Sequence, residues 1–367
     1  MRILQIIETN ELGGIELVAC LIFRYLHRMG EESYLCVKAA ARDRFIDHFQ
    51  LSEEESERVL TFNTNPALKG LDSTLKLAPI IRKVKPDLIH THKRRECMYV
   101  SLLQPQKQGA FHVRTMHYYV PNQKKIPFEA RILRKHVDAW AATSQSLIDE
   151  HMKDTGYIDI NMTRPIYNGI VDPAVKKDSA YEPQNKYCLV CRLSVQKGID
   201  ILLEQLRAMP QDLLDRLQID IYGDGPEEDA LIALRDKLCL NDVVHFMGVT
   251  KTPGEVMAGY DALLMPSRYE GLPMSWLEAM AVGTPVATHV VGCVREVIKH
   301  KENGWIIDES YTWEDFFKDN LVASPEYHAI SKNARETYLE KYTDTHMCEE
   351  YYALYKSLMK NLQKTKK

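Results

Sequence analysis

Two glutamates with seven residues between them are the strongest candidates in this sequence for contact with a ligand. Glu270 follows a predicted strand, residues 262–265, and lies on a loop. Glu278 lies about one turn inside a helix predicted to begin near Met274. Ionised carboxylates accept strong hydrogen bonds from hydroxyl groups, so the pair is suited to a sugar. The same spacing also fits two solvated glutamates near a helix start, and both interpretations stay open at this point.

The chain between the two glutamates adds an environment for an anion. Its loop residues Gly271, Leu272 and Pro273 lead into the helix. The first backbone N–H groups of a helix, here expected within residues 272–275, have no intrahelical partner. The helix dipole is positive at this end, and a diphosphate is the kind of anion that such an end binds.

A second pair of candidates, Arg192 and Lys197, lies at the end of the predicted strand 187–193 and just after it. Arg192 offers a planar fork of donors, and Lys197 offers a compact positive charge. Together they can hold a diphosphate and stabilise the negative charge that develops on it when a bond to it breaks. Two cations on a loop after a strand are also compatible with plain solvation.

These stretches resemble the motifs of the retaining nucleotide-sugar glycosyltransferases of family four, which have the GT-B fold. The run 270–286 is similar to the family's Glu-x7-Glu motif, and the run 191–198 is similar to its Gly-Arg-Leu-x3-Lys-Gly motif. The sequence departs from the family at Cys191 and at Cys293, where glycine is common. Both departures bear on how closely the backbone approaches a ligand. The resemblance is most specific within residues 187–307.

The resemblance implies binding roles for the matching residues. Glu278 would bind the ribose hydroxyls of the nucleotide, and Glu270 would hold hydroxyls of the transferred sugar. Arg192, Lys197 and Gly14 would hold the diphosphate. Backbone groups of the loop would assist Glu270, and these belong to Gly271, Leu272, Pro273 and Met274.

Two further positions follow from the resemblance. Val249 would lie near the nucleotide base, and His117 would lie near the donor sugar and the acceptor. The implied catalytic residues are therefore Glu270, Arg192, Lys197 and His117. A single histidine after a strand is as often structural as functional, so the role of His117 stays open in the sequence.

The reaction implied is transfer of a sugar from a nucleotide diphosphate to an acceptor hydroxyl, with retention of anomeric configuration. No carboxylate is placed as a nucleophile of the kind that retaining glycoside hydrolases use, which favours same-face attack assisted by the leaving phosphate. No metal or other cofactor is expected, because the chain contains no Asp-x-Asp triplet and Arg192 and Lys197 can neutralise the phosphates.

The elements that must position these residues alternate between strands and helices. A buried strand at 2–7, the pair Gly13-Gly14 and a helix at 15–29 form the opening of a doubly wound α/β domain. The glycine pair is not a dinucleotide fingerprint. Another strand runs into His90 and His92, at the carboxyl end where open sheets gather ligands.

The alternation of strands and helices repeats after a polar linker, 173–186, which predicts two Rossmann-like doubly wound domains facing a central cleft, the GT-B arrangement. Residues 1–172 are expected to bind the acceptor, and residues 173–345 the nucleotide sugar. Because GT-B proteins return their last helix to the first domain, the resemblance implies that helix 346–367 crosses back.

A basic helix lies within residues 126–137 and carries Arg131, Arg134 and Lys135 beside apolar Ile132 and Leu133. It is compatible with peripheral contact to an anionic membrane, with an acceptor phosphate, or with simple solvation. A lipid-linked acceptor becomes plausible with the family resemblance, since such acceptors lie at the cytoplasmic leaflet.

The composition limits the classes of protein that fit this sequence. The 367 residues carry a net charge of −4, with 45% hydrophobic and 27% charged residues, as in an ordinary globular protein, and no nucleic-acid partner is implied. No apolar run approaches a membrane span, and the start is not that of a signal peptide, so a cytoplasmic protein is expected, and peripheral contact with the membrane stays open. Its eight scattered cysteines form no metal-ligand pattern.

The sequence therefore predicts a glycosyltransferase that moves a sugar, with a UDP-sugar favoured, to a glycan or lipid-linked acceptor of a surface polysaccharide or lipopolysaccharide. The alternatives are a GT-B sugar epimerase or phosphorylase and a non-catalytic nucleotide-sugar binding protein. The presence together of Glu270, Glu278, Arg192 and Lys197 argues against the last of these. The base, the sugar, the acceptor and the oligomeric state are not determined.

Overall fold

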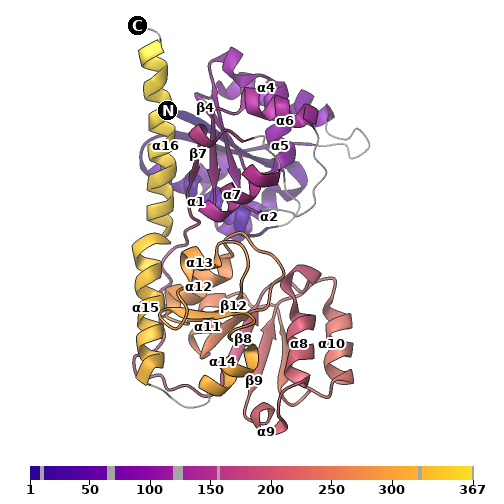
Figure 1. Ribbon diagram of the computed structural model, residues 1–367. Helices are drawn as coiled ribbons and strands as arrows, with labels where there is room; N and C mark the ends of the chain where they lie inside the picture. The colour runs from indigo at the N-terminus through magenta and orange to yellow at the C-terminus, as the bar shows by residue number, and fades with distance from the viewer. Residues whose placement is uncertain (9–11, 64–70, 119–126, 155–157, 321–324, 366–367) are drawn as a thin grey trace. The chain divides into compact units, whose positions relative to one another are not determined.

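The computed structural model describes residues 1–8, 12–63, 71–118, 127–154, 158–320 and 325–365 of the chain. It divides the chain into two compact units (Figure 1). Unit 1 comprises Met1–Gly169 and Asp344–Lys367, and unit 2 comprises Ile170–Thr343. Each unit is built on one sheet, and every strand pairing among the described residues is parallel.

Unit 1 has a seven-stranded sheet in the order β3-β2-β1-β4-β5-β6-β7. The strands are β1 (Arg2–Ile7), β2 (Glu32–Lys38), β3 (Val59–Phe62), β4 (Leu88–Thr91), β5 (Phe111–Met116), β6 (Ala139–Ala142) and β7 (Thr163–Pro165). The helices are α1 (Gly14–Arg28), α2 (Arg42–Phe49), α3 (Glu53–Glu57), α4 (Leu71–Val84), α5 (Arg94–Leu102), α6 (Pro127–His136), α7 (Gln145–Asp154) and α16 (Asp344–Thr365).

Unit 2 has a six-stranded sheet in the order β10-β9-β8-β11-β12-β13. The strands are β8 (Lys186–Val190), β9 (Gln218–Tyr222), β10 (Val244–Gly248), β11 (Ala262–Met265), β12 (Val286–His289) and β13 (Gly304–Ile307). The helices are α8 (Ile199–Arg207), α9 (Gln211–Leu214), α10 (Glu228–Lys237), α11 (Pro253–Ala258), α12 (Met274–Val282), α13 (Val294–Val297), α14 (Trp313–Asp319) and α15 (Pro325–Lys341).

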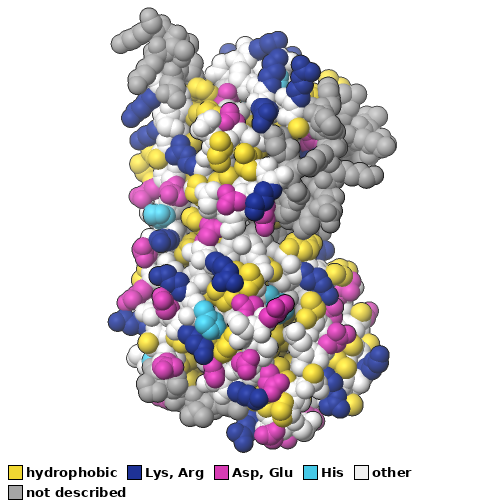
Figure 2. All heavy atoms as spheres, viewed as in Figure 1, with side chains coloured by type: hydrophobic (Ala, Val, Ile, Leu, Met, Phe, Trp, Pro, Cys, Tyr) yellow, Lys and Arg dark blue, Asp and Glu magenta, His cyan; other side chains and the backbone are white. Residues whose placement is uncertain are grey.

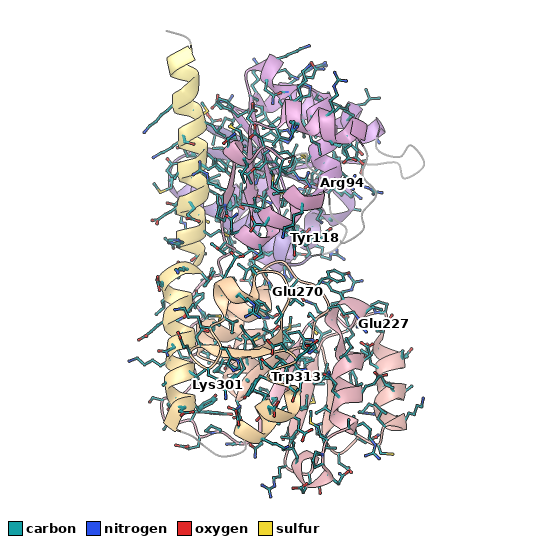
Figure 3. The ribbon with its side chains drawn as sticks, in the orientation of Figure 1. Arg94, Tyr118, Glu227, Glu270, Lys301 and Trp313 are labelled. Carbon is teal, nitrogen blue, oxygen red and sulfur yellow. The ribbon has the colours of Figure 1, made fainter. Side chains whose placement is uncertain are left out.

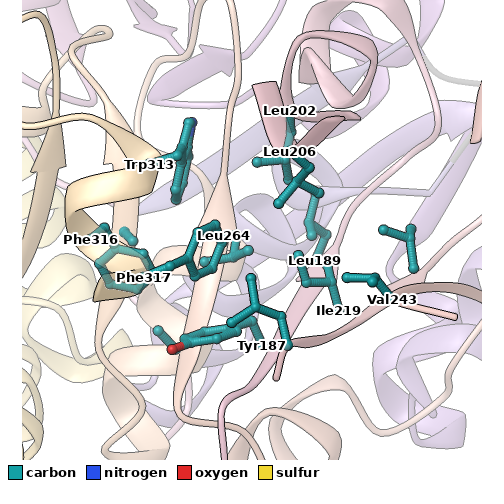
Figure 4. Packing of buried hydrophobic residues seen from close by; sticks show 14 of the residues in the cluster. Tyr187, Leu189, Leu202, Leu206, Ile219, Val243, Leu264, Trp313, Phe316 and Phe317 are labelled. Atoms are coloured by element: carbon teal, nitrogen blue, oxygen red, sulfur yellow. The ribbon is translucent and has the colours of Figure 1, made fainter. Parts of the chain in front are cut away.

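The strands of unit 2 are short apolar runs because their side chains are buried in its core. Leu189, Ile219 and Leu264, from three neighbouring strands, are almost fully buried, as expected for a parallel sheet covered by helices. Figure 4 shows aromatic side chains of α14 and leucines of α8 packed around these strand residues. This packing fixes the strand ends, and the loops after them, in place.

The C-terminal helix α16 belongs to unit 1 through polar contacts as well as packing. Tyr355 Oη lies 2.7 Å from His90 Nδ1, and Tyr351 Oη lies 2.9 Å from Thr115 Oγ1. Tyr352 donates to Glu31 at 2.7 Å. A segment more than two hundred residues away in sequence is therefore held on the same sheet as β4 and β5.

Unit 2 begins at Ile170, slightly before the boundary after residue 172 that the sequence predicts. The tyrosine hydroxyl of Tyr338 donates to the Ile170 carbonyl at 2.9 Å, and Arg335 holds Asp172 through two hydrogen bonds of 2.6 and 2.7 Å. These contacts come from α15 of unit 2. The residues just before the polar linker therefore pack with unit 2.

Candidate functional site

The strand order of unit 2 reverses between β8 and β11, which are neighbours in the sheet although β9 and β10 lie between them in the sequence. In open parallel sheets a ligand binds beyond the carboxyl ends of the strands at such a reversal. The loop after β8 carries Arg192 and Lys197, and the loop after β11 carries Glu270. Figure 3 labels Glu270 at this edge of unit 2, together with Glu227 after β9.

Lys197 and Glu270 form an ion pair at the reversal. Lys197 Nζ donates to Glu270 Oε1 at 2.7 Å, and the two side chains are only 15% and 6% exposed. Gln196 Nε2 donates to the carbonyl of Tyr269 at 3.0 Å and approaches Glu270 Oε2 at 3.4 Å. The structure thus brings together one predicted phosphate ligand and one predicted sugar ligand, 73 residues apart in sequence.

A second set of contacts locks the same two loops to each other. Arg268 donates to both carboxylate oxygens of Asp200, at 2.8 and 2.6 Å, and to the carbonyl of Val195 at 2.7 Å. The Arg268 backbone N–H donates to the Gln196 carbonyl at 2.8 Å. A bidentate arginine contact has a fixed geometry, so Arg268 sets the distance between Lys197 and Glu270.

Two glycines allow the loops to approach this closely. Gly198 has φ +64°, and a Cβ there would lie 2.1 Å from the Pro266 carbonyl oxygen. Gly292 has φ +48°, and a Cβ there would lie 2.2 Å from the Glu270 carbonyl oxygen. The next residue, Cys293, is fully buried, and its thiol donates to the Gly271 carbonyl at 3.0 Å. This departure from the family pattern therefore stabilises the loop that carries Glu270.

Helix α12 begins at Met274 with Pro273 as its N-cap residue. The first-turn N–H groups without an intrahelical partner therefore belong to residues 274–276. The predicted range 272–275 is wrong because it starts before the helix and includes Pro273, which has no N–H. Glu278 lies one turn further on and is partly buried. Burial raises the pKa of its carboxyl to about 7, and no hydrogen bond or ion pair joins it to another described residue.

The remaining predicted residues of unit 2 lie at the same edge of the sheet. Arg192 is exposed directly after β8, and its loop is held by Leu193, whose N–H donates to the Asp224 carbonyl at 2.7 Å. Val249 follows β10, two strands away from β8, and is 66% exposed. An exposed apolar side chain at this edge is a suitable surface for a flat base.

Gly14 and His117 belong to unit 1. Gly14 is the first residue of α1, and the preceding N–H of Gly13 donates to Glu16 Oε2 at 3.1 Å. Glu16 is itself paired with Lys93 at 2.8 Å, so a carboxylate already occupies part of this helix start. His117 directly follows β5 and its Nε2 lies 3.2 Å from Nδ1 of His92.

Several residues that shape the site carry no signal in the sequence. Gln196 and Arg268 are ordinary surface types, and only the sheet order shows that their loops are neighbours. His289 accepts from Trp313 Nε1 at 2.9 Å and lies with its Nδ1 3.1 Å from the Pro266 carbonyl, which anchors the loop that carries Glu270. Burial lowers the pKa of His289, consistent with a neutral ring in this position.

The basic helix α6 presents Arg131, Arg134 and Lys135 as exposed side chains. Its Leu133 is fully buried in a cluster with Trp140, so this residue is not available to a membrane. Arg94 of α5 pairs with Glu129 through two hydrogen bonds of 2.6 and 2.7 Å. On the face shown in Figure 2, basic and acidic side chains are interspersed.

Two kinds of feature, metal-ligand clusters and membrane-spanning helices, are absent from the described residues. No group of three or more His, Cys, Asp or Glu side chains among them is arranged to hold a metal ion. No helix in the described part of the chain combines the length and the apolar character needed to cross a membrane.

Comparison with known proteins identifies both units. Residues 12–172 match the family model Glycosyltransferase Family 4, and residues 172–337 match the model Glycosyl transferases group 1. An uncharacterized glycosyltransferase of Methanocaldococcus jannaschii is 34% identical over 178 residues, which are 46% of this chain and 44% of that protein. The lipopolysaccharide glucosyltransferase WaaG of Escherichia coli is 30% identical over 183 residues, 49% of this chain and 46% of that protein.

The chain thus spans about half the length of the curated relatives it matches. Among solved structures, HepE of Anabaena in complex with UDP superimposes with a TM-score of 0.80 at 19% identity, covering 97% of this chain and 100% of that one. This likeness extends over both units and shows their fold. With two parallel sheets of this topology and matches to both family models, the chain belongs to the family four glycosyltransferases, which have the GT-B fold.

Proposed function

We propose that the protein is a retaining hexosyltransferase that takes a sugar from a nucleotide diphosphate, with a UDP-sugar favoured, and attaches it to a hydroxyl of a glycan or lipid-linked acceptor. The single observation that carries this proposal is the Lys197–Glu270 ion pair at the strand reversal of unit 2, with Glu278 on the helix that follows the Glu270 loop. A cation of a type that binds phosphate and two carboxylates of a type that binds hydroxyls, on neighbouring segments of unit 2, support this proposal.

The chemistry of the proposed step follows from these groups. The acceptor oxygen forms a bond to the anomeric carbon on the face from which the diphosphate leaves, and the carbon–oxygen bond to the diphosphate breaks. Lys197 and Arg192 stabilise the negative charge that develops on the leaving phosphate, while the leaving oxygen receives the acceptor's proton. Glu270 holds the hydroxyls of the transferred sugar, and Glu278 holds those of the ribose.

The pairing of Lys197 with Glu270 gives the site a charge that is balanced before the donor arrives. A lysine ammonium has three donors, so Lys197 can keep one hydrogen bond to Glu270 and offer others to a phosphate oxygen. Because Arg192 and Lys197 supply positive charge at the leaving group, the proposal includes no divalent metal.

The choice of UDP and of a surface-glycan acceptor is supported by relatives. The HepE structure contains UDP, and the matched relatives include proteins named for lipopolysaccharide, colanic acid and O-antigen synthesis. Peripheral membrane contact through the exposed Arg131, Arg134 and Lys135 forms part of the proposal, because cations near an anionic leaflet each contribute roughly 1 kcal/mol. Sedimentation with phosphatidylglycerol vesicles, against neutral vesicles, tests this part separately.

The transferase proposal is tested by donor turnover. The protein is incubated with UDP-glucose, UDP-galactose, UDP-N-acetylglucosamine or GDP-mannose, with a lipopolysaccharide extract as acceptor, and released nucleoside diphosphate is measured with and without chelator. Release from a UDP-sugar that is unchanged by the chelator, with an α-configured product from an α-configured donor, is the expected result. Inversion of configuration or an absolute metal requirement would contradict the proposed mechanism.

A further inference from the structure

Three polar side chains of the unit 1 sheet form a chain of hydrogen bonds that has no role in the reaction proposed above. They come from β1, from the residue after β4 and from the residue after β5, which are neighbouring strands. Gln5 Oε1 lies 3.1 Å from His92 Nε2, and His92 Nδ1 lies 3.2 Å from His117 Nε2. The rings of His92 and His117 are stacked, 5.5 Å apart and inclined by 25°.

The direction of each hydrogen bond in this chain follows from its first member. Gln5 Nε2 donates to the backbone carbonyl of Ala19 at 3.1 Å, and a carbonyl can only accept. The other end of the amide, Gln5 Oε1, therefore faces His92, and His92 Nε2 must carry the proton. A neutral His92 then has an unprotonated Nδ1, which accepts from His117, so His117 carries its proton on Nε2.

Burial keeps both rings neutral. Gln5, His92 and His117 are 0%, 2% and 9% exposed. Burial lowers the pKa of His117 to about 3, helped by Lys93 and Arg114, and lowers the pKa of His92 well below its usual value. The buried carboxylate Glu96 accepts three backbone N–H groups, those of Glu8, His92 and Lys93, and no imidazole of a described residue.

This chain of hydrogen bonds is a relay from Gln5 through His92 to His117. It leaves Nδ1 of His117 available to a ligand. This nitrogen is unprotonated, and no described residue donates a hydrogen bond to it. An unprotonated ring nitrogen repels an anion and accepts from a hydroxyl, so it discriminates between a phosphate oxygen and a sugar alcohol.

We propose that Gln5 and His92 are positioning residues that hold His117 as its Nε2–H tautomer, so that Nδ1 of His117 accepts a hydrogen bond from a hydroxyl of the substrate. This inference rests on the proposed function for the presence of a sugar at His117. It assigns to the unit 1 sheet the recognition of an uncharged hydroxyl.

The tautomer itself is measured by long-range 1H–15N correlation of the full chain labelled with 15N-histidine, without any ligand. Signals are assigned with His117→Asn and His92→Asn variants. The expected result is one protonated and one unprotonated nitrogen in His117, with the proton on Nε2, at neutral pH. A proton on Nδ1, or a charged ring, would overturn the proposal.

Two other histidines of the chain serve as internal controls, because they hold the opposite tautomer. His112 Nδ1 lies 2.9 Å from the His136 carbonyl, and His289 Nδ1 lies 3.1 Å from the Pro266 carbonyl. Because a carbonyl only accepts, both rings carry their proton on Nδ1. The two tautomers must therefore appear in one spectrum, and this tests the assignment before His117 is interpreted.

Function is tested by substitutions that keep or remove the acceptor. An Asn oxygen can occupy the place of Nδ1, whereas a Gln amide reaches the place of Nε2, so His117→Asn should retain several-fold more kcat than His117→Gln, with the Kd for UDP unchanged in both. Gln5→Met matches glutamine in length and removes the acceptor, and it should mix the two tautomers of His117 and lower kcat several-fold.

The outcomes separate this inference from the proposed function. Equal kcat for His117→Asn and His117→Gln, or an unchanged His117 tautomer and kcat in Gln5→Met, overturns the relay while the transferase remains. The Nε2–H tautomer in a protein that turns over no nucleotide sugar overturns the proposed function, and the role of the relay toward a sugar hydroxyl is lost with it. If Gln5→Met does not fold, the spectrum of the unsubstituted protein still decides the tautomer.

Discussion

The two sheets reverse their strand order in the same way, between β1 and β4 in unit 1 and between β8 and β11 in unit 2, but they place different chemistry at the reversal. Unit 2 places a charged pair, Lys197–Glu270, and a carboxylate without a described partner, Glu278. Unit 1 places a buried, neutral chain of amide and imidazole groups that ends at His117.

The difference shows how one topology serves two kinds of ligand. Charged groups suit a diphosphate, since they can exchange one ionic partner for another. Neutral groups in a buried network have fixed donor and acceptor directions, and these suit an uncharged hydroxyl. If this comparison is correct, substitutions in unit 2 change nucleotide affinity or charge stabilisation, and substitutions at His117 change turnover alone.

The largest effect is expected for Glu270→Ala. Loss of the group that orients the transferred sugar should lower kcat by about 100- to 1,000-fold, the range seen when a preorganised transition-state contact is removed. UDP affinity should be kept or improved, because Lys197 loses its competing partner. Donor turnover and calorimetric titration of UDP measure the two quantities, and unchanged turnover would remove Glu270 from the reaction.

Arg192→Ala should weaken nucleotide binding itself. A charge-assisted hydrogen bond contributes about 1.5–3 kcal/mol, so the Kd for UDP should rise roughly 10- to 100-fold. Arg216→Ala is the matched control, since Arg216 is an exposed arginine just before β9, at the opposite end of that strand. Equal UDP affinity of the Arg192 variant and the parent protein would place the diphosphate elsewhere.

A pH dependence is expected from Glu278. Burial raises the pKa of its carboxyl to about 7, and the ionised form is the one that accepts from ribose hydroxyls. As pH rises through 7 the ionised fraction grows, so UDP-glucose should bind up to about 10-fold more tightly at pH 8 than at pH 6. UDP-glucose is used because its diphosphate has no second ionisation in this range. Glu278→Gln should remove the dependence, and its persistence in that variant would assign it to another group.

The smallest effect concerns the loop geometry alone. Gly198→Ala adds a Cβ that would lie 2.1 Å from the Pro266 carbonyl oxygen, in a left-handed backbone. Gly248→Ala is the control, because Gly248 is also left-handed, with φ +72°, but has nothing within 4 Å of the added Cβ. The control should lose only the backbone cost of about 1–2 kcal/mol. Thermal unfolding should show a larger decrease for Gly198→Ala, and equal decreases would mean that the loop adapts without cost.

Most of the fold could be predicted from apolar periodicity and turn residues. The structure confirms the predicted strand Arg2–Ile7 and the helix α12 near Glu278. The charged region before residue 59 forms α2 and α3, which a hydrophobic pattern does not predict, because their apolar residues are few and α3 buries none. Strand β13 has four residues, too few to show a period of its own.

The site is predictable only where a motif carries it. Glu270 and Lys197 are matched by family motifs, but their pairing depends on β8 and β11 being neighbours, which is a property of the sheet order. The bidentate contact of Arg268 and the amide direction of Gln5 depend on residues 68 and 14 positions away, respectively. A local sequence pattern does not identify such partners, because the residues between them do not determine which strands are neighbours or how they are aligned.

The most direct test of the central claim is a thermal-shift panel of UDP, GDP, UDP-glucose and GDP-mannose on the parent protein and on Arg192→Ala, each with and without chelator. A ligand that binds only the folded state raises the Tm with the logarithm of its concentration over Kd. We predict a rise in Tm with the uridine nucleotides that the chelator does not change and that Arg192→Ala reduces. A parent protein that shows no shift with any nucleotide, or the same shift in the variant, would contradict a diphosphate site at the reversal of the unit 2 sheet.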